Sequence, residues 1–217
     1  MKVVILCGGQ GTRLRQETEY RPKPLVQIGG RPILWHIMKI YAHYGFNEFV
    51  LCLGYKGRLI KEYFLNYQAM NNDVTLQLGP QKCIAFHGNH EEQDFKVTLA
   101  DTGDETMTGG RVRRIKPYID QDTFMVTYGD GVADIDIEAL LDFHQAHDKM
   151  ATVTAVRPPT RFGILEINDR NVVTSFAEKP RMEGRISCGF FVFSRKVFDY
   201  LDDDETILEQ EPLENLA

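Results

Sequence analysis

The residues best suited to chemistry stand in the segment Gly8–Leu14, which reads Gly-Gly-Gln-Gly-Thr-Arg-Leu. It follows the apolar run Val3–Cys7. Glycine has no Cβ atom, so its backbone N–H groups can come close to an anion. Arg13 and Lys23 add positive charge nearby. The pattern predicts an anion-binding turn at the end of a strand, and a plain turn with a solvated basic face is the alternative.

The spacing of the glycines narrows the choice of anion. The dinucleotide fingerprint needs a third glycine, and Leu14 stands at that position. This argues against an NAD-dependent oxidoreductase. The Walker phosphate loop needs Lys-Ser or Lys-Thr, and neither follows Gly11. The pairing of this loop with Arg13 and Lys23 therefore favours a nucleoside triphosphate.

A second candidate is Asp130, which stands between two glycines directly after the apolar run Thr123–Tyr128. Mg²⁺ is usually held by one or two protein carboxylates together with substrate phosphates. Asp130 is therefore a candidate metal ligand. Gly-Asp-Gly is also good turn chemistry, so a strand-ending turn is the competing interpretation.

The elements that must position these residues alternate between strand and helix. Apolar runs predict strands over residues 2–6 and 48–53, and helical spacing predicts helices over residues 32–44 and 58–67. Pro32 suits the start of the first helix and Gly45 its end. Asp136 is the expected cap of a helix that carries Ile137, Leu140, Leu141 and His144 on one face. Further strands are expected at 74–78, 95–101, 123–130, 151–156, 162–168, 172–180 and 188–194, and short helices at 109–119 and 195–203.

This order predicts an α/β protein with a parallel sheet first and extra antiparallel strands later. A length of 217 residues without a linker or repeat favours one domain over residues 1–217. The net charge of −6 argues against a nucleic-acid binder. The apolar runs are too short for a membrane span, and we see no signal peptide. Four cysteines without C-x-x-C spacing are expected to be buried, reduced thiols of a cytoplasmic protein, without a zinc site.

Several motifs occur in the order found in sugar-1-phosphate nucleotidyltransferases. "GGQGTRL" with "RPKPLVQIGGRPIL", "TYGDG", "FG" at Phe162–Gly163 and "FAEKP" resemble that family's nucleotide, metal, sugar and sugar-phosphate segments. "GYKG", "IKEYF", "DTGDETMTGGRVRR" and "FHQAH" are most similar to its glucose-1-phosphate cytidylyltransferase branch. The resemblance covers essentially the whole chain. It implies a Rossmann-like, mostly parallel mixed sheet flanked by helices, the glycosyltransferase A-like nucleotidyltransferase fold.

The resemblance also implies roles for individual residues. Arg13, Lys23 and Asp130 would be the catalytic residues, with Asp130 holding Mg²⁺. The nucleotide would contact Leu6, Cys7, Gly8, Gly9, Gln10, Gly11, Thr12, Arg13, Lys23, Thr106, Arg111 and Gly129. The sugar and its phosphate would contact Gly163, Glu178, Lys179 and Gly189.

The chain departs from the family's pattern at two places. Ser187-Cys188-Gly189 stands where the family has Asn-Gly-Gly, which bears on the choice of sugar. The family also continues beyond the position of Ala217 with a segment that brings a second metal-binding aspartate. We therefore expect a chain that lacks this segment and holds its metal through Asp130.

The implied reaction joins CTP and α-D-glucose 1-phosphate, giving CDP-glucose and pyrophosphate by Mg²⁺-assisted in-line displacement. By the same resemblance, the CDP-glucose would supply deoxysugars for bacterial surface polysaccharide (O antigen, lipopolysaccharide). There are two alternatives. The protein could be a nucleotidyltransferase for another nucleoside triphosphate or sugar 1-phosphate, or a non-catalytic homologue that binds a nucleotide or a sugar nucleotide. Family members commonly assemble, so the resemblance also allows a homo-oligomer. A nucleic acid or a membrane is not expected as a partner.

Overall fold

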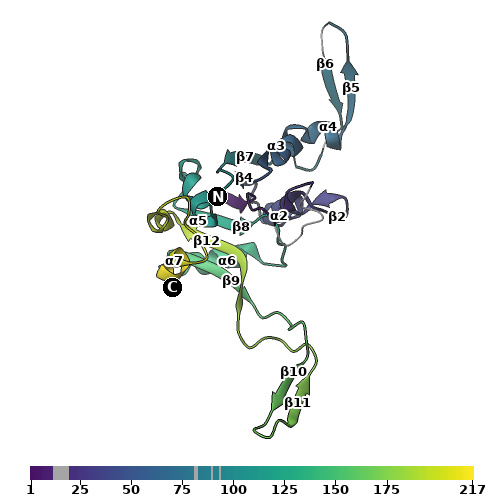
Figure 1. Cartoon of the computed structure of the whole chain (residues 1–217). Helices are drawn as coiled ribbons and strands as arrows, with labels where there is room; N and C mark the ends of the chain where they lie inside the picture. Colours follow the sequence, from purple (N-terminus) through teal and green to yellow (C-terminus); the bar gives the residue numbers. More distant parts are fainter. Residues whose placement is uncertain (12–19, 81–82, 89, 93) are drawn as a thin grey trace.

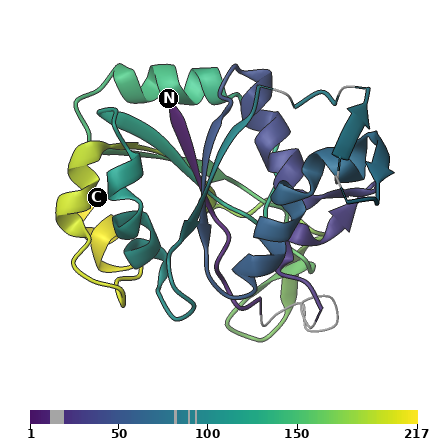
Figure 2. The same cartoon turned by 90° about the horizontal axis from the view of Figure 1, so that it is seen from above.

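The computed structural model of the chain describes residues 1–11, 20–80, 83–88, 90–92 and 94–217. Its centre is a six-stranded sheet with the strand order β7-β4-β1-β8-β12-β9 (Figures 1 and 2). The first four strands pair in parallel, whereas β12 is antiparallel to β8 and to β9. The predicted mixed α/β sheet is thus confirmed. Its strands are β1 (Lys2–Leu6), β4 (Glu48–Leu53), β7 (Lys96–Asp101), β8 (Thr123–Tyr128), β9 (Ala151–Val156) and β12 (Ile186–Ser194).

Helices cover both faces of this sheet (Figure 2), because side chains alternate between the two faces along each buried strand. Val3 and Ile5 of β1 belong to the core under α2, α3 and α6. Val4 and Leu6 belong to the core under α5 and η4. The helices are α2 (Ile33–His43), α3 (Gly57–Leu65), α4 (Tyr67–Asn71), α5 (Thr108–Arg114), α6 (Ile137–Gln145) and α7 (Glu211–Leu216), with 3₁₀ turns η2 (Lys23–Leu25), η3 (Lys116–Tyr118) and η4 (Arg195–Tyr200).

The predicted helix ends agree with the structure. Helix α2 begins directly after Pro32, and the chain leaves it through Gly45, whose φ of +81° suits glycine. The Asp136 carboxylate accepts a hydrogen bond from the Ala139 backbone N–H at 2.9 Å, which confirms the cap of α6. The helix expected over residues 58–67 is divided into α3 and α4.

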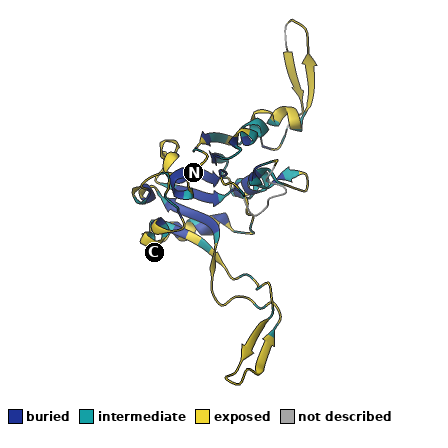
Figure 3. Cartoon of the chain, viewed as in Figure 1, coloured by how far each residue is buried: buried dark blue, intermediate teal, exposed yellow. Residues whose placement is uncertain are grey.

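Two hairpins extend away from the sheet (Figure 1), and almost all of their residues are exposed (Figure 3). We call β5 (Asp73–Gln77) with β6 (Cys83–His87) the first arm, and β10 (Ile164–Ile167) with β11 (Val173–Ala177) the second arm. The sequence analysis missed β6, a short strand of only five residues, and the two-residue strands β2 (Gln27–Ile28) and β3 (Arg31–Pro32). Large apolar side chains are exposed on both arms, among them Val74, Leu76, Ile84, Phe86, Ile164, Leu165, Ile167, Val173 and Phe176.

The expectation of four buried thiols is only half right. Cys52 of β4 and Cys7, directly after β1, are buried, but Cys83 is exposed on the first arm and Cys188 is half-buried. The apolar neighbours that suggested burial of Cys83 are themselves exposed in this arm. In the described part of the chain, no helix is both long and apolar enough to cross a bilayer.

Candidate nucleotide site

A cavity of about 760 Å³ opens beyond the carboxyl ends of β1 and β8. β1 lies between β4 and β8, so the connections from these neighbouring strands leave in opposite directions. Such a switch point is where open α/β sheets bind ligands. The two strand ends are joined by the Gly129 backbone N–H, which donates to the Leu6 carbonyl at 2.9 Å. Ten predicted residues line the cavity: Leu6, Cys7, Gly8, Gly9, Gln10, Gly11, Lys23, Thr106, Arg111 and Asp130.

Lys23 and Asp130 meet in this cavity, although 107 positions separate them. The Lys23 ammonium donates to a carboxylate oxygen of Asp130 at 3.0 Å. Lys23 belongs to η2 and Asp130 follows β8, so the fold itself brings them together. The Lys23 side chain is 16% exposed and that of Asp130 41% exposed. A cation and an anion thus stand side by side, one suited to phosphate oxygens and the other to a metal ion.

Arg111 is the buried charge of the site, with 4% of its surface exposed. Its guanidinium donates to five neutral oxygens at 2.7 to 3.2 Å: the carbonyls of Gly8, Leu53, Gly103 and Asp104 and the hydroxyl of Thr102. Burial lowers the pKa of Arg111, while Cys52 and Asp104 act in the opposite direction. An arginine remains charged under such a shift. Arg111 therefore fixes the loops after β1, β4 and β7 and adds positive charge to the cavity.

Gly8 makes room for this arginine. A Cβ atom at Gly8 would lie 2.1 Å from Arg111 Nη1, and one at Gly54 would lie 2.3 Å from the same atom. Gly9 has open space instead, and Gly11 has a φ of +71°. The two glycines thus have different roles. The missing Cβ atom of Gly8 leaves space for the Arg111 side chain, whereas Gly9 faces open space.

Comparisons with known proteins agree with this geometry. The "Nucleotidyl transferase" family model matches residues 2–214. The chain belongs to the nucleotidyl transferase family. The glucose-1-phosphate cytidylyltransferase of Salmonella typhimurium is 53% identical over 219 residues, covering 100% of this chain and 84% of that protein. A probable glucose-1-phosphate cytidylyltransferase of Bacillus subtilis is 50% identical, with the same coverage. The predicted resemblance is thereby confirmed.

A solved structure supports the fold assignment of this nucleotidyltransferase. HddC from Yersinia pseudotuberculosis, in a complex with GMP-PN, superposes with a TM-score of 0.68 at 26% identity. The match covers 100% of this chain and 86% of HddC. The mixed sheet flanked by helices is therefore the glycosyltransferase A-like fold of the nucleotidyltransferases.

Other predicted residues of this nucleotidyltransferase lie at the margin of the cavity or outside the description. Gly129 and Gly189 contact lining residues: a Cβ atom would lie 3.0 Å from Cys7 Sγ and 2.5 Å from Tyr128 Cδ2, respectively. Thr12 and Arg13 lie outside the described residues. Burial raises the pKa of the Cys7 thiol, which suits packing rather than reaction.

Three of the four predicted sugar residues, Gly163, Glu178 and Lys179, lie together at the base of the second arm. A Cβ atom on Gly163 would lie 3.2 Å from a carboxylate oxygen of Glu178, and Glu178 lies 3.7 Å from the Lys179 ammonium. No residue of this arm is among the described residues that line the cavity. The structure thus brings these three residues to one another and places them outside the nucleotide cavity.

Sequence reasoning missed seven residues that line the cavity, and three of them, Thr108, Tyr128 and Glu209, are joined by hydrogen bonds. Thr108 donates to a Glu209 carboxylate oxygen at 2.6 Å, and Tyr128 donates to the other oxygen. All three line the cavity. Tyr128 could have been found, because it ends the strand that precedes Asp130. Glu209 stands 101 positions from Thr108, and no local pattern connects the two.

The residues of the cavity fit a Mg²⁺ ion that is held by one protein carboxylate together with substrate phosphates. Among the described residues, no group of three or more His, Cys, Asp or Glu side chains could hold a metal ion. Asp130 lines the cavity with part of its carboxylate exposed. One carboxylate is sufficient where substrate phosphates supply further ligands.

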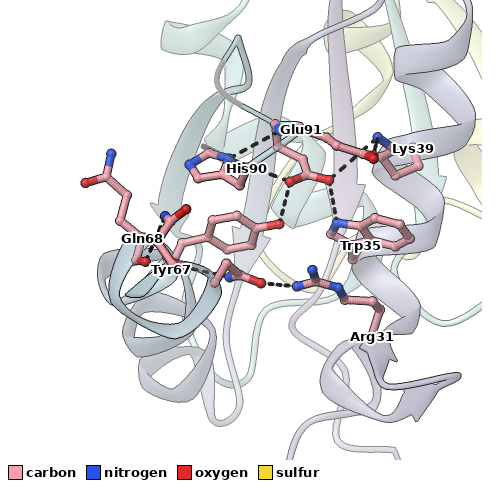
Figure 4. Close-up of polar contacts among 10 residues, drawn as sticks. Arg31, Trp35, Lys39, Tyr67, Gln68, His90 and Glu91 are labelled. Carbon is pink, nitrogen blue, oxygen red and sulfur yellow. Dashed lines mark hydrogen bonds and ion pairs between the residues drawn. The ribbon is translucent and has the colours of Figure 1, made fainter. Parts of the chain in front are cut away.

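A second buried charge, Glu92, is not among the residues that line this cavity. Its neighbours Trp35, Lys39 and Tyr67 are labelled in Figure 4. Its carboxylate accepts from Trp35 Nε1–H and the Tyr67 hydroxyl, both at 3.0 Å, and lies 3.6 Å from the Lys39 ammonium. Burial favours a higher pKa for Glu92, but the hydrogen bonds from Tyr67 and Trp35 outweigh it and the pKa is lowered. This Glu92 cluster joins α2 and α4 at the base of the first arm.

Proposed function

We propose that this protein transfers the cytidylyl group of CTP to α-D-glucose 1-phosphate, giving CDP-glucose and pyrophosphate. The observation that carries the proposal is the cavity in which the glycine loop, Lys23, Asp130 and Arg111 meet. The relatives named glucose-1-phosphate cytidylyltransferase support the choice of nucleotide and sugar. The product would feed bacterial surface polysaccharide.

The reaction needs positioning and charge neutralisation more than covalent help. A phosphate oxygen of glucose 1-phosphate attacks the α-phosphorus of CTP. The bond from the α-phosphorus to the oxygen that bridges it to the β-phosphate breaks, and pyrophosphate leaves with that oxygen. Lys23 would neutralise phosphate charge, and Arg111 would hold the loop after β1 in place and attract the nucleotide. The sugar would be held by Gly163, Glu178, Lys179 and Gly189.

Asp130 would hold Mg²⁺ in this reaction. When bound with the triphosphate, the ion would neutralise the charge of the phosphate oxygens. The Asp130 carboxylate is at present paired with Lys23 at 3.0 Å. We expect Lys23 to turn from Asp130 toward a phosphate oxygen when the substrate and the ion are bound.

The test is a matrix of pyrophosphate-release assays, with four nucleoside triphosphates against a panel of sugar 1-phosphates, with and without Mg²⁺. We expect the highest kcat/KM for CTP with glucose 1-phosphate, and only when Mg²⁺ is present. Faster turnover of another nucleotide or sugar would overturn the choice of substrates. Binding of CDP-glucose without pyrophosphate release from any pair would instead show a non-catalytic homologue.

Arg13 gives a sharp test of the proposed phosphate contacts. A guanidinium can bind phosphate oxygens through two parallel hydrogen bonds, and the family resemblance supports this role for Arg13. Arg13→Ala is expected to lower kcat/KM by roughly 3–5 decades, or about 4–7 kcal/mol. Steady-state kinetics would measure this, with Arg21→Ala as the control. A loss below tenfold would remove Arg13 from the catalytic residues.

The exposed arms support association of the protein with copies of itself. Large exposed apolar surfaces commonly mark interaction sites, and Phe176 on the second arm is 64% exposed. We expect light scattering after size exclusion to give a multiple of 24.9 kDa. Phe176→Asp should shift the protein toward the monomer, whereas Ser175→Asp on the same strand should not. A monomeric wild type would contradict the expectation.

A further inference from the structure

Glu209 connects the two walls of the nucleotide cavity. One wall is the start of α5, where Thr106, Thr108 and Arg111 stand, and the other is the end of β8, where Tyr128 precedes Asp130. The two oxygens of the Glu209 carboxylate accept from opposite walls, Oε2 from Thr108 at 2.6 Å and Oε1 from Tyr128.

The chain before Glu209 is fixed firmly on the first wall. The Thr108 hydroxyl accepts from the Leu208 backbone N–H at 2.9 Å, and Leu208 itself is fully buried. Close packing makes this attachment tight: a Cβ atom on Gly109 would lie 2.7 Å from Thr206 Cγ2, and one on Gly110 would lie 2.7 Å from Asp204 Cα. The position of the Glu209 backbone is therefore set by the start of α5.

The Tyr128 ring is fixed on the second wall in a similar way. Gly189, with a φ of +80°, lies flat against it, because a Cβ atom there would come within 2.5 Å of the ring. Phe191 packs against the ring edge-on, with centroids 6.1 Å apart. Burial, followed by the hydrogen bond to Glu209, raises the pKa of Tyr128, so the hydroxyl keeps its proton and donates it.

We infer that Glu209 is a positioning residue that, through Tyr128 and Thr108, holds the α5 wall at a fixed distance from the wall that carries Asp130. The inference rests on the proposed function, since it concerns the site of that reaction. A carboxylate serves this purpose well, because it can accept from two hydroxyl donors at once. Charge-assisted hydrogen bonds of this kind are about twice as strong as neutral ones.

Loss of Glu209 is expected to disturb the orientation of the reacting groups more than the binding of CTP. Small displacements of groups that orient a reaction cost up to about a hundredfold in rate. Glu209→Ala is expected to lower kcat for CTP by about 10- to 100-fold and to raise KM less. Glu209→Gln keeps an oxygen acceptor and should retain kcat within about threefold. The matched control is Glu205→Ala, which removes the same charge from the same segment at a residue that does not line the cavity.

Two further measurements separate positioning from folding. In a double-mutant cycle, Tyr128→Phe combined with Glu209→Ala should lose little more than either single variant, since both break one connection. Hydrogen–deuterium exchange of the peptides over residues 104–112 and 123–130 should be faster in Glu209→Ala than in wild type. A purely structural role would lower the melting temperature and leave the kcat of the folded enzyme unchanged.

The outcomes are distinct from those that test the proposed function. Wild-type turnover with unchanged kcat and unchanged exchange in Glu209→Ala would overturn the inference and leave the function standing. Absence of wild-type turnover would overturn the function, and the exchange measurement would still decide the role of Glu209. Additive losses in the double-mutant cycle would also contradict the inference.

Discussion

Arg111 and Glu92 are both buried charges, yet their surroundings differ. Arg111 donates to five neutral oxygens beside the cavity at the carboxyl ends of β1 and β8. Glu92 accepts from two neutral donors and also has the Lys39 ammonium 3.6 Å away (Figure 4). Hydrogen bonds satisfy both groups, but among the described residues Glu92 has an ion-pair partner, whereas Arg111 has none and Asp104 acts on it without forming an ion pair.

This difference indicates what each charge is for. A charge solvated by dipoles alone keeps its field, which an incoming anion can use. A charge with a counter-ion beside it contributes mainly to the local structure. We therefore expect Arg111 to affect both activity and stability, and Glu92 to affect stability alone.

Of the two buried charges, Arg111 is expected to give the larger effect when it is replaced by alanine. This substitution leaves several buried oxygens without donors and lets the loop after β1 move, so kcat/KM for CTP should fall by about 10²- to 10³-fold. The free energy of unfolding should fall by about 3 kcal/mol, measured by urea denaturation. Arg113→Ala, an exposed arginine on the same helix, is the control and should change neither quantity much.

Gly8→Ala tests the role of Arg111 in a second way, because the added Cβ atom would occupy the place of the Arg111 guanidinium. It should reproduce much of the Arg111→Ala phenotype. If Gly8→Ala or Arg111→Ala kept full activity, the distinction between the two buried charges would fail.

A smaller effect is expected from Glu92→Ala. It leaves the Trp35 and Tyr67 donors without their acceptor, which costs about 2 kcal/mol, or roughly 4–8 °C in melting temperature. Pyrophosphate release per folded molecule should stay within about twofold of wild type. The control is Glu91→Ala, whose exposed ion pair with Lys39 at 3.0 Å should contribute little. A large loss of kcat in Glu92→Ala would contradict the comparison.

The smallest effect is the pH dependence of the Glu92 contribution. Its pKa is lowered in the folded protein relative to the ordinary 4.5, so folding favours the ionised form. The stabilisation is fully present above pH 4.5 and is lost as the pH falls through the lowered pKa. The gap in unfolding free energy between wild type and Glu92→Gln should therefore be constant near neutrality and narrow in acid. A gap that widens in acid would show the opposite shift.

Much of the fold could be predicted from local patterns. The helix between Pro32 and Gly45 and the cap at Asp136 follow from single residues whose backbone preferences are strong. β6 could not be found in this way, because Cys83–His87 does not alternate between polar and apolar residues as Asp73–Gln77 of β5 does. The burial of Cys83 was wrongly expected because its apolar neighbours suggested a core, whereas they are exposed on the first arm.

The place of the segment Leu6–Gly11 and of Asp130 was predictable because these residues follow the ends of parallel strands. Lys23 belongs to η2, and its place in the cavity was expected from the family resemblance. The glycine motif predicts close approach of an anion, whereas in the structure Gly8 makes room for Arg111 of the same chain. Glu209 depends on tertiary contacts across about a hundred residues, which no local pattern encodes.

The chain has a single tryptophan, Trp35, and its indole N–H belongs to the Glu92 cluster. Fluorescence excited selectively at the indole therefore reports on the base of the first arm and not directly on the nucleotide cavity. An emission change on adding CTP would reveal communication between the two regions. If the emission of Trp35 does not change when CTP binds, the same emission can be used to follow the attachment of the first arm alone.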